Sequence, residues 1–226
     1  MDPRPHSDLS VELAPPLAWR SIVPIALAEL VLLAATSGGY GFHRDELYFL
    51  AAGHHLAFGY PDQPPLTPLL GRVATALFDV SPPALRLFPE LATAVTVVLG
   101  RLLAREFGGR DVAQAIAAAA VAVSGAMYAG HLLSTETFDL LFWVALLWLL
   151  VRLLRTRDER LWLPMGIVTG VAIENKNLVL MLVAAVVVAA VIARRLDIFR
   201  SRYFLLAAAV AVVLWLTNLI WQGLHE

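Results

Sequence analysis

Long apolar stretches alternate with short polar ones along most of this chain of 226 residues. The first apolar stretch opens at Trp19 and Arg20 and continues to about Thr36, which is enough to cross a hydrocarbon layer about 30 Å thick. A cleavable signal peptide is the alternative for this stretch, because small residues follow it at 34–39. Six further apolar runs predict membrane-spanning helices at about 86–105, 112–129, 137–154, 161–174, 178–193 and 203–222.

The composition places the chain among membrane proteins. It is 59% hydrophobic and 15% charged, with a mean hydropathy of +0.73, which is too apolar for a soluble domain of this length. The net charge of −1 gives no basic face for nucleic acid, and the absence of cysteine excludes disulfides and thiolate chemistry. We therefore predict an all-α polytopic membrane protein with about seven transmembrane helices. A single domain over 19–226 follows a short disordered cytoplasmic tail at 1–18.

Basic residues indicate how the spans are oriented. With a cytoplasmic N-terminus, the other side of the membrane receives few basic residues, namely Arg44, Arg72, Arg86 and Lys176. The cytoplasmic side then receives a larger set: Arg4, Arg20, Arg105, Arg110, Arg152, Arg155, Arg157, Arg160, Arg194, Arg195, Arg200 and Arg202. This asymmetry is the one that the positive-inside rule describes. It predicts that residues 40–84 form the first extracytoplasmic loop.

This first loop carries the densest group of polar residues. We expect interfacial helices in this loop, and residues 44–58 have a helical pattern that is too polar to span the membrane. Asp45 and Glu46 would open that helix, where acids also have a purely structural use, since they complement the macrodipole by about 0.3–1 kcal/mol. The prolines in 59–65 then prevent a helix, so Tyr60, Asp62 and Gln63 would lie on a stiff turn.

Two further polar segments are predicted on the same side. The connection at 130–139 contains His131, Glu136 and Asp139. Because a carboxylate at bilayer depth costs roughly 2.5–3.5 kcal/mol, Asp139 is expected to face a wet cavity or a partner. The segment Glu174-Asn175-Lys176-Asn177 contains the only lysine of the chain, away from the arginine-rich side.

A metal site has weak support in the sequence. No HExxH pair occurs, and the adjacent His54 and His55 would diverge by about 100° on a helix, so zinc is not expected. Asp45, Glu46 and Asp139 offer oxygen ligands to a hard divalent cation, which leaves such a cofactor open, but too few ligands are evident to assign one.

Three segments together carry a family resemblance: HRDELYFLAAGHHLAFGYPDQPPLTPLL, GHLLSTETFDLLFW and ENKNLVL. They resemble the bacterial membrane glycosyltransferases of family 39 type, which are GT-C-fold relatives of the protein O-mannosyltransferases and the lipid A aminoarabinose transferases. The resemblance covers about residues 20–222. It implies a GT-C-like N-terminal module in the bacterial plasma membrane. It also implies a polyprenyl-phosphate sugar donor, membrane lipid around it, and a protein, glycan or lipid acceptor.

The resemblance also implies roles for individual residues. Asp45 matches an acid needed for transfer, with Glu46 beside it, and Asp139 matches a second acid at the start of the fourth span. Lys176 matches a lysine thought to meet the donor phosphate. Residues expected to bind substrate around these positions are Arg44, Tyr60, Asp62, Gln63, His131, Glu136 and Asn175.

Three positions depart from the family pattern. Gln63 stands where the aminoarabinose transferases have a lysine, which removes one positive charge from the expected phosphate site. Glu174 and Asn177 stand where an apolar and an aromatic residue are usual. Family members also usually continue well past residue 226, so a truncated, fragmentary or minimal form remains open.

The competing hypothesis is a non-catalytic membrane module: a truncated transferase half, a lipid-binding scaffold or a transporter fragment. In a transporter, Glu29, Glu90 and Asp139 would belong to an ion path. The chain shows no paired halves of the kind that many transporters have.

Overall fold

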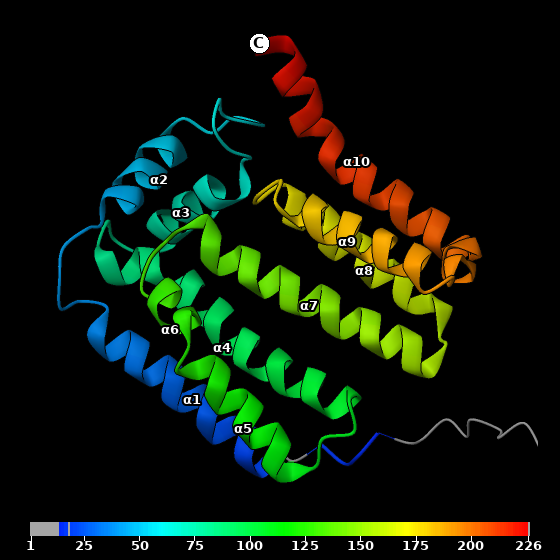
Figure 1. Cartoon of the computed structure of the whole chain (residues 1–226). Coiled ribbons are helices and arrows are strands. Elements are labelled where there is room, and N and C mark those ends of the chain that lie inside the picture. The colour runs from blue at the N-terminus through cyan, green and yellow to red at the C-terminus, as the bar shows by residue number, and fades with distance from the viewer. Residues whose placement is uncertain (1–13, 18, 226) are drawn as a thin grey trace, which may run out of the picture.

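The structure is a computed structural model that describes residues 14–17 and 19–225, and this part of the chain is helical without β-strands. Most of the predicted disordered tail, residues 1–13 and 18, lies outside the described residues. The helices are α1 (Trp19–Thr36), α2 (Arg44–His54), α3 (Leu66–Leu77), α4 (Pro82–Glu106), α5 (Asp111–Ala122), α6 (Gly125–Gly130), α7 (Thr135–Thr156), α8 (Trp162–Ile173), α9 (Val179–Ile192) and α10 (Arg202–His225). Two 3₁₀ helices, η1 (Glu159–Leu161) and η2 (Leu196–Arg200), connect them (Figure 1).

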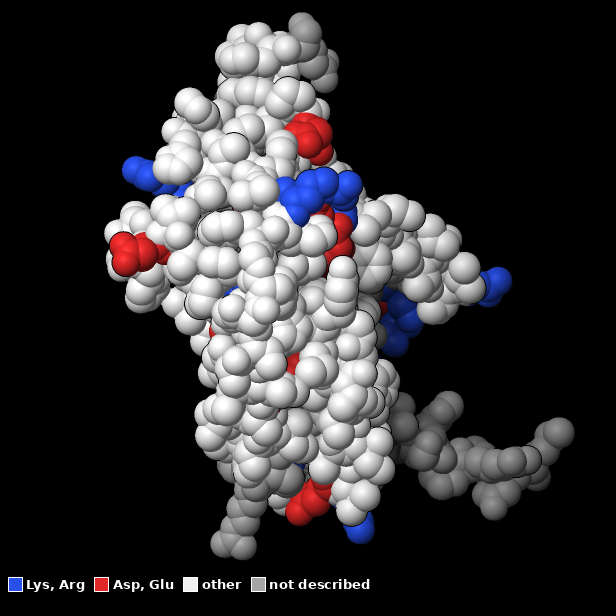
Figure 2. Space-filling model, turned by 90° about the vertical axis from the view of Figure 1, so that its left-hand side faces the viewer, with Lys and Arg blue, Asp and Glu red and all other residues white. Residues whose placement is uncertain are grey.

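The predicted all-α membrane architecture is confirmed. Among the described residues, α4, α7 and α10 are long and apolar enough to cross a membrane. Shorter apolar helices accompany them at Ile22–Thr36, Leu66–Leu77, Asp111–Ala122 and Val179–Ile192. Figure 2 shows charged side chains near the upper part and the lower tip of one face, with a broad uncharged surface between them. That surface is what a helical bundle presents to hydrocarbon.

One predicted span is wrong as a continuous helix. The apolar run at 112–129 breaks after α5, because Val123 leaves the helical conformation and Ser124 caps a new helix by accepting a hydrogen bond from the Ala126 N–H group. A serine side chain competes for backbone groups, which favours helix caps over helix interiors. A shift of hydropathy does not mark this break, so the apolar run concealed it.

The bundle has two ends with different chemistry. We call one the α2 end: it carries α2, the turn at 59–65, the connection at 131–134 and the connection at 174–178. The opposite end carries the connections at 107–110, 157–161 and 193–201, where ten arginines gather in or next to the helix ends. They are Arg105, Arg110, Arg152, Arg155, Arg157, Arg160, Arg194, Arg195, Arg200 and Arg202.

Close helix contacts set the positions of the connections. α7 packs between α4 on one side and α8 on the other, and α10 packs along α8 (Figure 1). A Cβ atom at Gly166 would lie 2.4 Å from the Ala207 carbonyl oxygen, and one at Gly170 would lie 2.6 Å from Leu214 Cδ1. Small residues spaced by four thus let the α8 and α10 backbones approach, as is common in membrane bundles.

The last turns of α10 are tied to the first polar loop. The Asn218 Nδ2 group donates to the carbonyl oxygen of Phe58 at 3.0 Å, and the Gln222 Nε2 group donates to that of Tyr60 at 3.0 Å. Gly59 between them leaves no room for a side chain, because a Cβ atom there would lie 2.6 Å from the Trp221 ring. The residues that lead into the turn of Asp62 and Gln63 are therefore anchored to α10.

Candidate active site

The helix that carries the two adjacent acids begins at a capping box. His43 is the N-cap of α2: its Nδ1 atom accepts from the Asp45 N–H group at 3.3 Å, and its own N–H group donates to Glu46 Oε2 at 2.8 Å. This reciprocal arrangement satisfies backbone groups that a helix start leaves free. The polar sequence that predicted an interfacial helix therefore also fixes the directions of Asp45 and Glu46.

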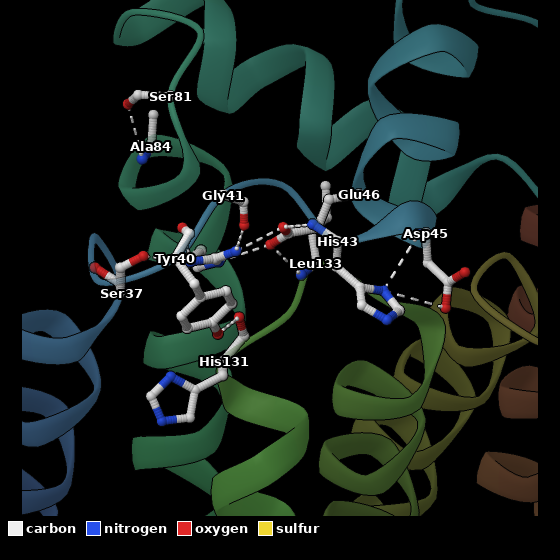
Figure 3. Close-up of polar contacts among 11 residues, drawn as sticks. Ser37, Tyr40, Gly41, His43, Asp45, Glu46, Ser81, Ala84, His131 and Leu133 are labelled. Atoms are coloured by element: carbon white, nitrogen blue, oxygen red, sulfur yellow. Dashed lines mark hydrogen bonds and ion pairs between the residues drawn. The ribbon is translucent and has the colours of Figure 1, made fainter.

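Glu46 is buried in an ion pair with Arg86 of α4. Both side chains are fully buried, and the guanidinium contacts the carboxylate twice, Nε to Oε1 and Nη2 to Oε2, each at 2.8 Å. The same guanidinium donates to the carbonyl oxygens of Ser37 and, at 2.9 Å, Gly41, while the Leu133 N–H group donates to Glu46 Oε1 at 3.4 Å (Figure 3). The pair thus joins α1, α2, α4 and the start of α7.

Asp45 points away from this buried pair. Figure 3 shows its carboxylate diverging from that of Glu46, as adjacent positions on a helix require. Its side chain is 43% exposed and lies 3.1 Å from Arg44 Nε and 3.7 Å from His43 Nδ1. Arg44 itself is 89% exposed in its side chain. Of the two acids, Asp45 is the one that solvent and ligands can reach.

A polar cavity of about 450 Å³ lies at the α2 end, where three segments distant in sequence meet. The turn contributes Asp62, Gln63 and Pro64, and α7 contributes Thr135. The connection between α8 and α9 and the start of α9 complete the lining with Asn175, Lys176, Asn177, Leu178 and Met181. The first loop, the start of α7 and the lysine segment, which the sequence analysis placed on one side of the membrane, therefore share one hollow.

Tyr48 links the helix of Asp45 to this cavity. Its hydroxyl donates to Asp62 Oδ1 at 2.7 Å. Burial and this hydrogen bond to the Asp62 carboxylate raise the pKa of Tyr48 to about 12. Asp45 is not among the residues that line the cavity, but it lies one helical turn from Tyr48, which contacts the lining residue Asp62.

Asn175 holds the lysine segment in place. It is fully buried, its Oδ1 atom accepts from the Thr67 hydroxyl at 2.8 Å, and its Nδ2 group donates to the Thr135 carbonyl oxygen at 2.9 Å. The Leu66 N–H group adds a 2.9 Å hydrogen bond to the Glu174 carbonyl oxygen. Both polar atoms of the Asn175 amide are therefore used in hydrogen bonds to α3 and α7. These bonds hold the backbone next to Lys176 in place.

Lys176 is paired at the rim of the cavity. Its Nζ atom lies 2.9 Å from Glu136 Oε1, and the Thr135 hydroxyl donates to Glu136 Oε2 at 3.3 Å. The neighbouring Glu174 has a buried Oε1 atom without a hydrogen-bond partner among the described residues, and burial raises the pKa of this carboxyl to about 7.

The other predicted site residues lie around this cavity in different ways. Asp139 does not belong to its lining; it lies one turn below Thr135 on α7, 9% exposed, with Oδ1 lacking a hydrogen-bond partner among the described groups. Tyr60 donates its hydroxyl to the carbonyl oxygens of Ala52 (2.9 Å) and His55 (3.2 Å), so this hydroxyl braces the turn.

His131 lies beside the Glu46–Arg86 pair instead of in the cavity. Its carbonyl oxygen accepts from the Tyr40 hydroxyl at 3.1 Å, and the Arg86 guanidinium stacks 3.9 Å from the Tyr40 ring centre. Burial, and to a lesser degree the Arg86 charge, lowers the pKa of the imidazole. It therefore stays neutral at physiological pH.

Sequence reasoning missed Arg86, Thr67 and Tyr48. In the sequence, Arg86 is one more charged residue at the start of an apolar run. Its partner Glu46 lies 40 residues earlier, and no repeating pattern predicts a contact over that separation. Thr67 and Tyr48 are polar residues of short helices, and from the sequence alone simple exposure to solvent explains them as well as a role in the site. The helix of Arg86 also begins earlier than the predicted run at 86–105, because the adjacent prolines at 82 and 83 occupy its first positions and Ser81 caps it.

Comparison with known proteins identifies the family of the chain. The family profile of the dolichyl-phosphate-mannose-protein mannosyltransferases matches residues 62–221, which is more than half of the chain. The chain belongs to this mannosyltransferase family. The match includes the turn, the start of α7 and the lysine segment, whereas Asp45 and Glu46 precede it. No curated protein and no solved structure matches the chain.

Membership in this family places the chain among the GT-C-type glycosyltransferases, and its apolar helices are those of a membrane protein.

A second, apolar cavity of about 280 Å³ runs between α7, α8, α9 and α10. Its walls extend from Phe199 and Trp162 near the opposite end to Ile173 and Trp215 near the α2 end. Among the described residues, no group of three or more His, Asp or Glu side chains is arranged to hold a metal ion.

Proposed function

We propose that this protein transfers a sugar from a polyprenyl-phosphate donor to an acceptor hydroxyl at the α2 end. The observation that carries the proposal is the polar cavity, because it brings the only lysine of the chain next to Asp62, Gln63 and the start of α7. An ammonium group in such a cavity suits a phosphodiester, whose charge it offsets through charge-assisted hydrogen bonds.

The apolar cavity supports a donor with a hydrocarbon tail. Leu180, Leu182 and Val183 of α9 line it, and their neighbours in the chain, Leu178 and Met181, line the polar cavity. A lipid-linked sugar then lies with its tail along α9 and its head group against Lys176. Because the tail comes from the bilayer, where it is already out of water, its contacts with the cavity walls stabilise the complex through van der Waals packing.

In the proposed mechanism Asp45 is the general base. It accepts the proton of the acceptor hydroxyl as that oxygen attacks the anomeric carbon, while the bond from this carbon to the phosphate oxygen breaks and the configuration inverts. Base catalysis of this kind contributes about 10²–10⁴-fold. Lys176 offsets the charge that develops on the departing phosphate. Asp139, one turn from Thr135 on α7, is proposed to orient the acceptor. Glu46 is proposed to hold α2 in place through its ion pair with Arg86.

The orientation follows from the arginines. Ten lie at the opposite end or in the last turns that lead to it, which favours a cytoplasmic position for that end. The α2 end then faces away from the cytoplasm. We propose the bacterial plasma membrane as the location, with the acceptor being a protein, glycan or lipid.

Transfer of radiolabelled sugar in membranes tests this function. Wild type, Asp45→Asn and Lys176→Ala are compared at equal expression, with lipid extracted to follow donor consumption. The proposal expects the Asp45→Asn variant to lose 10²-fold or more of the transfer rate. Undiminished transfer by this variant would remove the proposed base.

Ion transport is the second candidate, because of three buried acids. Glu29 on α1, Glu90 on α4 and Asp139 on α7 are each at most 9% exposed, and each has a carboxylate oxygen without a hydrogen-bond partner among the described residues. Buried acids of this kind mark ion paths in transporters. Uptake driven by a pH gradient into vesicles, lost in Glu90→Gln, would favour transport over transfer.

A further inference from the structure

The ammonium group of Lys176 is paired with a carboxylate of α7. Glu136 Oε1 lies 2.9 Å from Lys176 Nζ, and the side chains are 61% and 34% exposed respectively. Glu136 stands in the first turn of α7, beside Thr135, which lines the polar cavity. The ion pair therefore lies at the mouth of the cavity, where an entering head group meets it.

The charges around this cavity do not favour an added anion. Among the described residues, its lining contains Lys176 and Asp62, and Glu136 adds a second carboxylate through the ion pair. One cation and two acids give a net charge of −1 when both acids are ionised. A phosphate that enters without any rearrangement meets repulsion instead of a free cation.

We propose that Glu136 is a competitor for the donor phosphate: it holds Lys176 in position while the site is empty and must release it when the phosphate binds. This inference rests on the proposed function. The exchange is feasible because an exposed ion pair is weak. Glu136 also keeps a favourable place after release, since the first turn of a helix stabilises a carboxylate. Glu136 is thus a positioning residue that sets donor affinity.

The proposal predicts a gain on removing a charge. The Glu136→Gln substitution keeps the shape of the side chain and a hydrogen-bonding oxygen for Lys176 but removes the competing charge. Affinity for an anionic lipid should then rise by about two- to fivefold, which is the range that an exposed ion pair allows. The gain should shrink in high salt, because screening weakens the Glu136–Lys176 attraction in the wild type and the phosphate attraction in the variant.

Binding of a polyprenyl phosphate to the full chain in nanodiscs measures this directly. This probe carries the phosphate and the tail but no sugar, so the measurement does not depend on turnover. Four proteins are compared: wild type, Glu136→Gln, Lys176→Gln and the double variant. Asp197→Asn is the matched control, because Asp197 pairs with Arg195 in an equally exposed ion pair, 3.1 Å, at the opposite end.

The expected result is tighter binding by Glu136→Gln, weaker binding by Lys176→Gln, and no gain from Glu136→Gln in the Lys176→Gln background. Unchanged or weaker binding by Glu136→Gln, or an equal gain in both backgrounds or in Asp197→Asn, would overturn the inference. Failure of the proposed function looks different: neither wild type nor any variant then binds the probe above its level in empty nanodiscs.

Discussion

The buried pair of Glu46 and Arg86 gives the sharpest test of what each of the two adjacent acids does. Glu46→Gln keeps the shape of the side chain but leaves the Arg86 guanidinium, fully buried, without a counter-charge. The structure therefore predicts a loss of stability, whereas Asp45→Asn, on an exposed side chain of the same helix, should lose activity instead.

The magnitude follows from burial and geometry. Both side chains are 0% exposed and share two contacts of 2.8 Å. Removing one partner of such a pair costs about 3–5 kcal/mol, because the remaining charge stays buried. On the scale of chains of this length, that corresponds to a fall in melting temperature of about 6–20 °C.

A double variant separates charge from hydrogen bonding. In Glu46→Leu with Arg86→Met no charge is buried, so this protein should be more stable than either single variant. It should remain below the wild type, because the Ser37 and Gly41 carbonyl oxygens and the His43 N–H group lose their partners. A buried polar group left without a partner costs about 1–3 kcal/mol.

Melting of the detergent-solubilised proteins, followed by tryptophan fluorescence, measures these differences, with radiolabelled transfer run on the same preparations. The reasoning fails if Glu46→Gln melts within 1–2 °C of the wild type and has lost transfer, since Glu46 would then act on substrate. It also fails if the double variant is no more stable than the single ones.

Three further predictions concern the cavity and its supports. Glu174→Gln should raise the melting temperature at pH 8 but not at pH 5, because the folded protein holds the pKa of this carboxyl at about 7, above its ordinary value of 4.5. The stability of the wild type therefore falls by about 3 kcal/mol as pH rises through this range, and parallel melting curves for variant and wild type would contradict the prediction. Asn175→Leu should cost about 2–3 kcal/mol and lower donor affinity, because Thr67 and the Thr135 carbonyl oxygen lose their partner; melting and lipid binding measure both, and Asn177→Leu, at an exposed position, is the control for melting alone. Gly166→Val should separate α8 from α10 and lower the melting temperature, whereas Gly125→Val, where a Cβ atom meets nothing within 4 Å, should not.

Most of the fold follows from hydropathy, and the reason is physical. In a bilayer a helix must satisfy its own backbone, so apolar length alone predicts α1, α4, α7 and α10 to within a few residues. The break between α5 and α6 depends on one serine side chain that no average over a window detects. The sequence also does not give the bounds of α3, because this helix has only 12 residues and directly follows a proline turn.

The candidate site was predictable in part. The segments around Asp62, Thr135 and Lys176 were expected on one side of the membrane, and the structure brings them to one cavity. The sequence does not show which of the two neighbouring acids, Asp45 or Glu46, is buried. That choice depends on Arg86, which reaches Glu46 across 40 residues of chain. Likewise, the pairing of Lys176 with Glu136 depends on how α7 and α8 pack.

The anchoring of residues 58–60 by Asn218 and Gln222 has a mechanical consequence. A substrate that displaces the proline turn must also pull on the final helix, whose glycine-lined contact with α8 runs towards the far membrane surface. Binding of the head group would thereby be transmitted over about fifteen residues of α10, a continuous helix, instead of being absorbed by a flexible loop. A spectroscopic label near residue 205 would then sense donor binding without lying anywhere near the sugar.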